Sequence, residues 1–260
     1  MLRNLLGAAL LAGVFISTQA VAAVKSEKIE YRHGDTQLTG YLYYDDAQQG
    51  ARPGIMVVHE WWGLNDYVRK RAEMLAELGY VAFAADMYGT GKATEHAAEA
   101  KGWMQQITAN QAEWQARAMS GLEQLKKNPL VDPAKTAAIG YCFGGSTVMQ
   151  MVYAGADLKG VASFHGSLPP PSEEQGKNIR SRIFIAHGAA DAMVPPERVQ
   201  QFQTALDQAG ADWQFVSYGG AKHGFTNPGA DKLGMDALAY DESADKRSWA
   251  QMQLFLKEIF

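Results

Sequence analysis

The sequence predicts a single α/β domain in which a mostly parallel, twisted sheet is covered by helices on both faces. Short and almost uninterrupted apolar runs, typical of strands buried on both sides, alternate along the chain with amphipathic helical segments. With 260 residues, 47% of them hydrophobic, the chain is long enough to bury one large core. It contains no repeat and no linker that would divide that core.

The predicted strands are of two kinds. The first two alternate polar and apolar residues around the turn His33-Gly34-Asp35, as a half-buried hairpin does. The later ones are short apolar runs, which are typical of fully buried strands. In chain order the strands are predicted over residues 28–31, 37–44, 54–59, 80–85, 136–140, 160–164, 182–186 and 214–218.

The helices between these strands are indicated by apolar residues three and four positions apart. Asn65 is predicted to cap the first helix, and Gly79 to end it. Residues 93–127 have helical character throughout. Further helices are predicted over 145–153, after the pair Pro195-Pro196, and at the end of the chain.

The first 22 residues are predicted to form a cleaved signal peptide. They contain one early arginine, a short apolar run over residues 5–16, and Ala20 and Ala22 in the A-x-A arrangement that signal peptidase accepts. The apolar run is too short for a stable membrane anchor. We therefore expect an exported protein, most simply in a bacterial periplasm, with one mature domain over residues 23–260.

Composition excludes several kinds of partner. The net charge is −4 and the longest basic block is Arg69-Lys70-Arg71, so nucleic acid and anionic membranes are not expected partners. The single cysteine excludes an intrachain disulfide and every multi-cysteine metal site. No histidine pair has metal-binding spacing, so we expect neither a metal nor another cofactor. We expect a monomer that acts on a small molecule.

The most informative segment is Gly140-Tyr141-Cys142-Phe143-Gly144-Gly145, between a predicted strand and an apolar helix. It matches the nucleophile elbow G-x-S-x-G, with cysteine in the serine position. The glycines allow strand and helix to approach around a strained turn. The helix N-terminus favours a thiolate at Cys142 and offers the N–H of Phe143 to an oxyanion. The alternative is a buried structural cysteine.

An acid and a histidine follow in the order that such an elbow requires. Asp191 lies in the loop between a buried strand and a helix, and His223 lies between glycines just past the next strand. The distances along the chain leave room for one strand and one helix between successive members. A loop aspartate and a surface histidine are the alternatives. Order and context predict a catalytic triad of Cys142, Asp191 and His223.

These segments resemble the dienelactone hydrolases, cysteine-dependent members of the α/β-hydrolase superfamily. The resemblance implies an α/β-hydrolase fold, and it implies that Glu60 contacts Cys142 in the resting enzyme until substrate frees the thiolate to pair with His223. It also implies that the Trp61 N–H joins that of Phe143 in the oxyanion hole. The matching segments are His59-Glu60-Trp61-Trp62-Gly63-Leu64-Asn65, Ala85-Asp86-Met87-Tyr88, Gly140–Gly145, His187-Gly188 with Asp191 and Val194-Pro195, and His223-Gly224-Phe225.

The sequence departs from the chlorocatechol-pathway members of that family at two positions. Those enzymes carry an arginine two residues after the tyrosine of their Asp-Leu-Tyr segment and another four residues after the catalytic histidine, and both hold the substrate carboxylate. Here these positions are Thr90 and Asn227. A buried carboxylate without a partner is costly, so uncharged substrates are favoured. Tyr88, Thr90, Phe225 and Asn227 are expected to line the substrate pocket.

We therefore predict an exported hydrolase of small esters or lactones, of the carboxymethylenebutenolidase type. Cys142 attacks the carbonyl, His223 acts as base and then as acid, and Asp191 orients His223. Two other interpretations stay open. A non-catalytic binding protein of the same fold would need a broken triad, and a thiol redox sensor would need an external thiol because the chain has no resolving cysteine.

Overall fold

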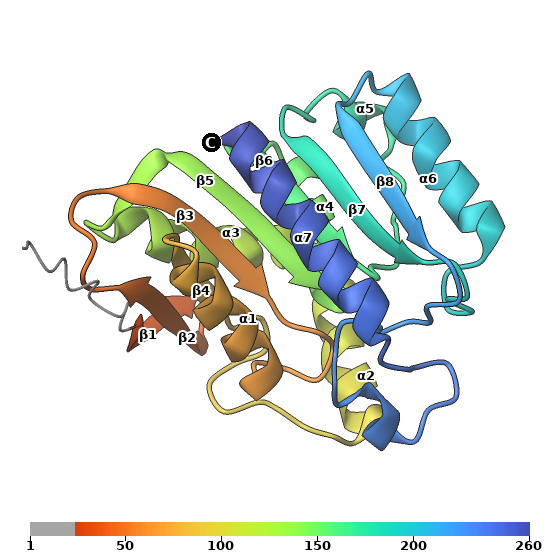
Figure 1. Cartoon of the computed structure of the whole chain (residues 1–260), viewed down its shortest axis with the longest axis horizontal. Helices are drawn as coiled ribbons and strands as arrows, with labels where there is room; N and C mark the ends of the chain where they lie inside the picture. The colour runs from red at the N-terminus through yellow and green to blue at the C-terminus, as the bar shows by residue number, and fades with distance from the viewer. Residues whose placement is uncertain (1–23) are drawn as a thin grey trace, which may run out of the picture.

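The computed structural model describes residues 24–260, which form one eight-stranded sheet with helices on both faces (Figure 1). The predicted signal peptide, residues 1–22, lies outside the described residues. The strands are β1 (Val24–His33), β2 (Thr36–Asp45), β3 (Arg52–Val58), β4 (Val81–Ala85), β5 (Val131–Tyr141), β6 (Gly160–Phe164), β7 (Arg182–Gly188) and β8 (Trp213–Tyr218). The helices are α1 (Asp66–Glu77), α2 (Ala97–Thr108), α3 (Gln111–Lys127), α4 (Phe143–Tyr153), α5 (Glu173–Gly176), α6 (Pro196–Gln208), the 3-10 helix η1 (Ala230–Leu233) and α7 (Glu242–Ile259).

The sheet has the strand order β1-β2-β4-β3-β5-β6-β7-β8. Every neighbouring pair from β4 to β8 is parallel. The hairpin of β1 and β2 is antiparallel and joins the sheet through an antiparallel pairing of β2 with β4. The alternating segments of the sequence thus form the antiparallel edge, and the apolar runs form the parallel strands. The predicted α/β fold with a mostly parallel sheet is confirmed.

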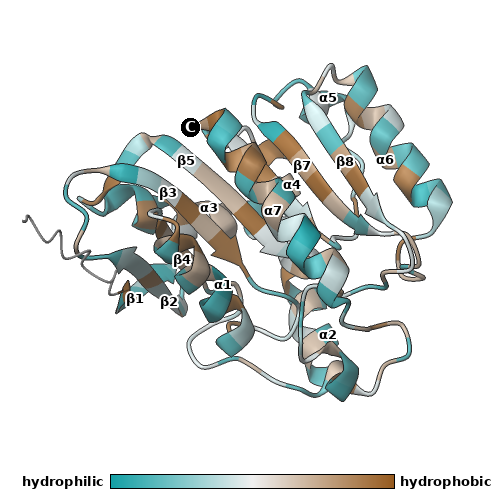
Figure 2. Ribbon diagram, in the orientation of Figure 1, coloured by the Kyte–Doolittle hydropathy of each residue, from teal (hydrophilic) through white to brown (hydrophobic). Residues whose placement is uncertain are grey.

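Different helices cover the two faces of the sheet. In β3, Met56 and Val58 point into an apolar cluster that includes α3, α4 and α6. Ile55 and Val57, which alternate with them, point into a second cluster with α1 and α7. In Figure 1, α1 and α7 lie in front of the sheet, and Figure 2 shows apolar residues along β3 and β7. Among residues 24–260, none of the helices combines the length and the apolar character needed to cross a membrane.

The sequence of residues 93–127 predicts helical structure throughout, but the structure has two separate helices there, α2 and α3. A cap at Asn110 divides them. Asn110 has extended backbone angles (φ −122°, ψ 104°), and its side chain accepts a hydrogen bond from the N–H of Glu113 at 3.2 Å. Such a cap starts a new helix. The N-cap predicted at the start of α1 is confirmed, because the side chain of Asn65 accepts a hydrogen bond from the N–H of Val68.

The parallel strands gather the candidate site residues at one edge of the sheet. The carboxyl ends of parallel strands meet at the same edge, and the loops that follow them hold the ligand sites of open α/β sheets. The residues in these loops are Glu60 after β3, Tyr88 after β4, Cys142 after β5, His165 after β6, Asp191 after β7 and His223 after β8.

Candidate active site

Cys142 occupies a strained turn between β5 and α4. Its backbone angles are φ 53° and ψ −114°, in a region that non-glycine residues rarely adopt. A Cβ atom on Gly140 would lie 2.0 Å from the carbonyl oxygen of Gly144, and one on Gly144 would lie 2.2 Å from that of Val58. Only glycine therefore fits at either position, and the turn presents Cys142 at the edge of the sheet.

His223 and Asp191 form a buried pair. Nδ1 of His223 lies 2.8 Å from Oδ2 of Asp191, and the two side chains are 5% and 0% exposed. The second carboxylate oxygen of Asp191 accepts a hydrogen bond from the N–H of Met193 at 2.9 Å, which fixes its orientation. Because Nδ1 is directed at the carboxylate, Nε2 is the nitrogen left to exchange a proton. Nε2 has no hydrogen-bond partner within the described part of the chain.

The surroundings of His223 favour its charged form. Burial lowers the pKa of His223, but the negative charge of Cys142 and the hydrogen bond to Asp191 outweigh burial and raise the pKa to about 10. A positively charged imidazole in turn stabilises a thiolate beside it. The charged form of His223 is thus favoured beside Cys142, with Asp191 at the opposite nitrogen of the ring.

Two backbone N–H groups are available beside the elbow. Phe143 is the first residue of α4, so its N–H has no acceptor inside the helix. Trp61 follows the end of β3, which packs against the start of α4: a Cβ atom on Gly144 would lie 2.7 Å from the carbonyl oxygen of His59. Among residues 24–260, neither N–H donates to a backbone carbonyl. Both are therefore free to bind an oxyanion.

Glu60 is hydrogen-bonded to Asn227, and among residues 24–260 it has no hydrogen bond to Cys142, with which the family resemblance implies a contact. Nδ2 of Asn227 donates to a carboxylate oxygen of Glu60 at 2.7 Å, and both residues are buried. Burial raises the pKa of Glu60 to about 7, against the hydrogen bond from Asn227 and the positive charges of His223 and Arg71, which lower it. Asn227, which is predicted to line the substrate pocket, thus binds the carboxylate of Glu60.

Tyr88, which is predicted to line the substrate pocket, packs beside the elbow. Its ring packs against those of His59 and Phe143, with centroid distances of 4.8 and 5.4 Å. The preceding loop is fixed by Asp86, whose carboxylate accepts a hydrogen bond from the N–H of Tyr88 at 2.9 Å. Burial and the nearby Cys142 raise the pKa of Tyr88, so its hydroxyl stays protonated. That hydroxyl is buried and has no hydrogen-bond partner among residues 24–260.

Two of the expected pocket residues lie elsewhere. Phe225 is 0% exposed and packs in the core beside Tyr218, with ring centroids 5.5 Å apart, so its prediction as a pocket residue is wrong. The side chain points inward because the apolar core gains more from an aromatic ring than the surface does. Thr90 is exposed and its hydroxyl lies 2.8 Å from that of Thr39. It lines a cavity of 210 Å³ that does not include Cys142.

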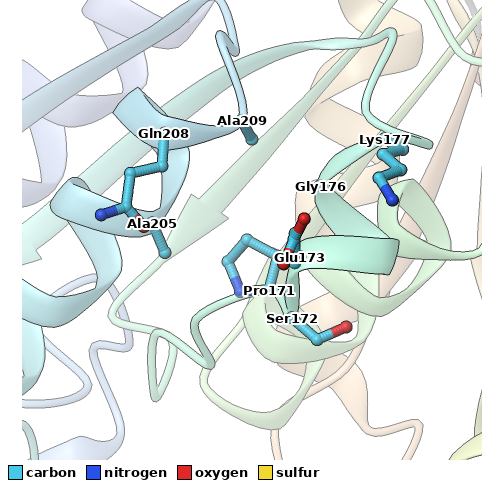
Figure 3. A pocket seen from close by; sticks show the side chains of 8 residues that line it. All are labelled: Pro171, Ser172, Glu173, Gly176, Lys177, Ala205, Gln208 and Ala209. Atoms are coloured by element: carbon cyan, nitrogen blue, oxygen red, sulfur yellow. The ribbon is translucent and has the colours of Figure 1, made fainter.

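Cavity size does not locate the site. A cavity of 470 Å³ lies between α5 and α6, and residues of both helices line it, among them Glu173 and Gln208 (Figure 3). None of the predicted site residues is in that lining. A cavity of 310 Å³ is lined by Tyr67, Asn227 and Lys232, so it reaches the candidate site through Asn227.

The structure adds one histidine that the sequence does not place in the site. Nδ1 of His165 accepts a hydrogen bond from the N–H of Cys142 at 3.2 Å, and its Nε2 lies 2.7 Å from the hydroxyl of Thr226. The only indication in the sequence is a histidine at the end of a buried strand. In the part of the chain that the structure describes, no group of three histidine, cysteine, aspartate or glutamate side chains is placed to hold a metal ion.

Comparison with known families identifies the family of this chain. A model of the dienelactone hydrolase family matches residues 38–260. The chain belongs to the dienelactone hydrolase family. The match begins in β2 and runs to the end of the chain, so it includes the whole parallel sheet and every loop at its carboxyl edge. Membership confirms the resemblance seen in the sequence and makes the protein a hydrolase of the ester and lactone class.

Similar proteins differ from this chain in sequence, and those with solved structures share its fold. A relative from Synechocystis sp., provisionally named a carboxymethylenebutenolidase, is 27% identical over 258 residues, which cover 91% of this chain and 98% of the relative. A dienelactone hydrolase-like promiscuous phosphotriesterase from metagenomic libraries is 37% identical with a TM-score of 0.89, covering 92% of this chain and 99% of the other. A thermophilic esterase of Thermogutta terrifontis, 21% identical with a TM-score of 0.63 over 90% of this chain and 92% of the other, shares the fold.

Proposed function

We propose that the protein is an exported hydrolase of small, uncharged esters or lactones, and that Cys142, His223 and Asp191 are its catalytic triad. One observation carries this proposal. The only cysteine of the chain lies in a strained turn at a helix N-terminus, and the nearby His223 is held by Asp191 at 2.8 Å with its second nitrogen unpartnered among residues 24–260. These are the nucleophile, the base and the orienting acid of acyl transfer.

In the first step the thiolate of Cys142 attacks the carbonyl carbon of the ester. A carbon–sulfur bond forms, and the negative charge that develops on the carbonyl oxygen is held by the N–H groups of Phe143 and Trp61. As the tetrahedral intermediate collapses, the carbon–oxygen bond to the leaving group breaks, and Nε2 of His223 gives its proton to the departing oxygen. A thioester on Cys142 and the free alcohol remain; with a lactone, both belong to one molecule.

In the second step water cleaves the thioester. His223 is now neutral and accepts a proton from water at Nε2, while Asp191 stabilises the positive charge that returns to the ring. The oxygen of water bonds to the carbonyl carbon, the carbon–sulfur bond breaks, and the acid product leaves. The thiolate and imidazolium forms of Cys142 and His223 are restored, and the reaction uses no cofactor.

Glu60 contributes charge to this site. The positive charge of His223 lowers the pKa of Glu60, so the Glu60 carboxylate in turn favours the imidazolium form of His223. The hydrogen bond from Asn227 holds the carboxylate in place. We therefore place Glu60 and Asn227 beside the triad as a pair that helps to keep His223 positively charged before the attack.

The charges around the site favour uncharged substrates. Thr90 and Asn227 stand where the chlorocatechol-pathway members of the family carry arginine, and the amide of Asn227 is already bonded to Glu60. A substrate carboxylate would meet the buried acid Glu60, and no arginine at positions 90 and 227 would pair with it, which makes its desolvation costly.

Phosphotriesters are a second candidate class of substrate, because the relative with 37% identity is named a promiscuous phosphotriesterase. Attack of the Cys142 thiolate at phosphorus would form a sulfur–phosphorus bond and expel an alkoxide or aryloxide, which takes a proton from His223. The charge on the phosphoryl oxygen would be held by the same N–H groups of Phe143 and Trp61. Water would then release the phosphodiester.

Export of the protein is proposed on the sequence of residues 1–22. Expression of the full chain in a Gram-negative bacterium, followed by fractionation and N-terminal sequencing, tests it. We expect periplasmic protein that begins at Ala23. Protein that stays in the cytoplasm with residues 1–22 attached would contradict export.

The proposed reaction is tested with the mature chain on a panel of small esters, lactones with and without a carboxylate, and aryl phosphotriesters. We expect hydrolysis of uncharged esters or lactones, a higher kcat/KM for these than for carboxylated lactones, and a loss of at least about 10³-fold in Cys142→Ala. Binding without turnover would support the binding-protein interpretation. Inertness to every ester, combined with peroxide oxidation of Cys142 that an external thiol reverses, would support the redox-sensor interpretation.

A further inference from the structure

His165 is a buried histidine for which the proposed reaction has no use. It directly follows β6, is 0% exposed, and has a backbone φ of 39°. A non-glycine residue keeps such a conformation only where its surroundings hold it there. Its ring packs edge to face against that of His223, with centroids 5.2 Å apart. Specific contacts must therefore hold His165 in this position.

Both ring nitrogens of His165 are engaged. Nδ1 accepts a hydrogen bond from the N–H of Cys142 at 3.2 Å, a donor that also reaches the carbonyl oxygen of Phe164 at 3.0 Å. Nδ1 therefore carries no proton, and in a neutral ring the proton must be on Nε2. Nε2 lies 2.7 Å from the hydroxyl oxygen of Thr226, to which it donates. Neither nitrogen is left for proton transfer, so His165 is not a second base.

Burial keeps His165 neutral, and nearby positive charges act in the same direction. Burial of the ring, together with the positive charges of His223 and Arg71, lowers the pKa of His165 well below its ordinary value. The ring thus keeps one acceptor and one donor while His223 gains and loses its proton. A protonated His165 would lose the acceptor that the N–H of Cys142 uses.

Thr226 is itself held from the opposite side. Its hydroxyl lies 2.6 Å from that of Tyr67 at the start of α1, and its carbonyl oxygen accepts a hydrogen bond from Arg71. Arg71 is buried and is paired with Asp245 of α7 at 2.5 Å. Thr226 is three residues beyond His223 on the same loop. The contacts of Thr226 therefore tie the loop of the proposed base to α1 and α7.

We propose that His165 is a positioning residue that fixes the elbow of Cys142 relative to the loop of His223, through the hydrogen bonds Cys142 N–H to Nδ1 and Nε2–H to Thr226. Cys142 and His223 belong to loops that follow different strands, β5 and β8, which are not neighbours in the sheet. His165 follows β6, between them. The bridge sets the distance between the thiolate of Cys142 and the imidazolium of His223. It therefore acts on the rate, because small errors in the placement of reacting groups lower rates strongly. This inference rests on the proposed function of Cys142 and His223.

The bridge is tested first by removing its acceptor. Thr226→Val keeps the shape of the side chain but lacks the hydroxyl, and Thr226→Ser keeps the hydroxyl. We expect Thr226→Val to lower kcat about tenfold with KM unchanged, and Thr226→Ser to restore kcat to within about twofold. The matched control is Thr136→Val in the middle of β5, which removes an equally buried hydroxyl bonded to the carbonyl oxygen of Asp157. It should lower the melting temperature and leave kcat unchanged.

A second readout does not depend on an ester substrate. The rate of alkylation of Cys142 by iodoacetamide, measured against pH, reports how well His223 stabilises the thiolate. We expect the midpoint of this profile to rise by about half a pH unit in Thr226→Val and not in Thr136→Val. His165→Asn should give the same rise, because the asparagine oxygen can replace Nδ1 but cannot reach Thr226, and asparagine tolerates a positive φ. The His165→Asn variant also tests the bridge if Thr226→Val does not fold.

The outcomes separate this inference from the proposed function. If kcat and the alkylation profile of Thr226→Val equal those of the wild type while only the melting temperature falls, the bridge is merely structural and the inference is overturned. If the wild type hydrolyses no ester, or Cys142→Ala hydrolyses as fast, the proposed function fails. The alkylation profiles then still decide whether the bridge positions the two groups: a shift supports it and superimposed profiles overturn it.

Discussion

The two ends of the parallel strands are built in opposite ways. At the carboxyl ends lie Cys142 and buried titratable side chains such as Glu60 and His223. All three non-glycine residues with positive φ among residues 24–260 are also there, namely Cys142, His165 and Leu168. Backbone strain and buried charge both cost stability. The residues at this edge of the sheet therefore lower the free energy of unfolding.

At the amino end of β7 the charged side chains stay in solvent, whereas Arg52 at the start of β3 is buried. Arg182, at the start of β7, pairs with Asp212 at 2.9 Å and with Glu258 at 2.8 Å, and all three side chains are at least 43% exposed. Exposed pairs of this kind contribute little. The contrast teaches that one sheet combines ordinary surface chemistry at the start of β7 with a reactive carboxyl edge whose unfavourable groups are held by specific hydrogen bonds. Four changes test that contrast.

The largest expected effect comes from Cys142 itself. Cys142→Ala and Cys142→Gly should both lose at least about 10³-fold in kcat/KM. Cys142→Gly should nevertheless be the more stable of the two by about 1 kcal/mol, because glycine relieves a φ of 53°. Thermal unfolding of both variants checks this difference. Equal or reversed stability would mean that the elbow stores no strain.

Asp191→Asn should lower kcat by about 10²- to 10⁴-fold, because asparagine cannot stabilise the positive charge of His223. The hydrogen bond and charge of Asp191 raise the pKa of His223, so the pKa should fall in this variant and the alkaline limb of the rate profile, where His223 loses its proton, should move to lower pH. The pH dependence of kcat/KM measures both effects. A kcat within about threefold of the wild type would remove Asp191 from the triad.

Glu60→Gln should change how stability depends on pH. The pKa of Glu60 is about 7 in the folded chain against an ordinary value of 4.5. Between these values the folded chain holds a proton that the unfolded chain has released, so the wild type loses stability as pH rises. Glutamine cannot ionise, so from about pH 4.5 to about pH 8 the variant should gain about 2–3 kcal/mol relative to the wild type. Urea unfolding at both pH values measures this gain, and parallel curves would contradict a buried, ionising Glu60.

The smallest effect is expected at the amino edge. Arg182→Met removes both exposed ion pairs and should lower the free energy of unfolding by less than about 1 kcal/mol, with ester turnover unchanged. Urea unfolding and the ester assay test this. A loss of more than about 2 kcal/mol would show that the two edges are not as different as their exposure indicates.

Most of the fold could be predicted from the sequence, because the apolar runs and the glycines are local signals. The elbow is a local signal as well, because the need for glycine at positions 140 and 144 on either side of Cys142 can be recognised within five residues of chain. The placement of Asp191 and His223 in neighbouring loops follows from the parallel topology. The break in the segment 93–127 was readable from Asn110, a residue that prefers N-caps.

The contacts between loops could not be predicted in the same way. Glu60 and Asn227 are 167 residues apart, and only the folded chain shows that the amide reaches the carboxylate. The same holds for His165 and Thr226, whose residue types alone do not indicate a partner. Phe225 shows the converse, because its neighbour His223 suggests a pocket while packing places the ring in the core.

The account stands on Cys142 as the nucleophile, and trapping the acyl enzyme tests this most directly. The mature chain is mixed with an activated uncharged ester, quenched in acid within the first turnover, and digested for mass spectrometry. Because the chain has one cysteine, a thioester can form at one position only. We predict an acyl group on the peptide that contains Cys142, formed in a burst and lost on further incubation. Turnover of the same ester with Cys142 unmodified, or with the acyl group on another side chain, would contradict the account.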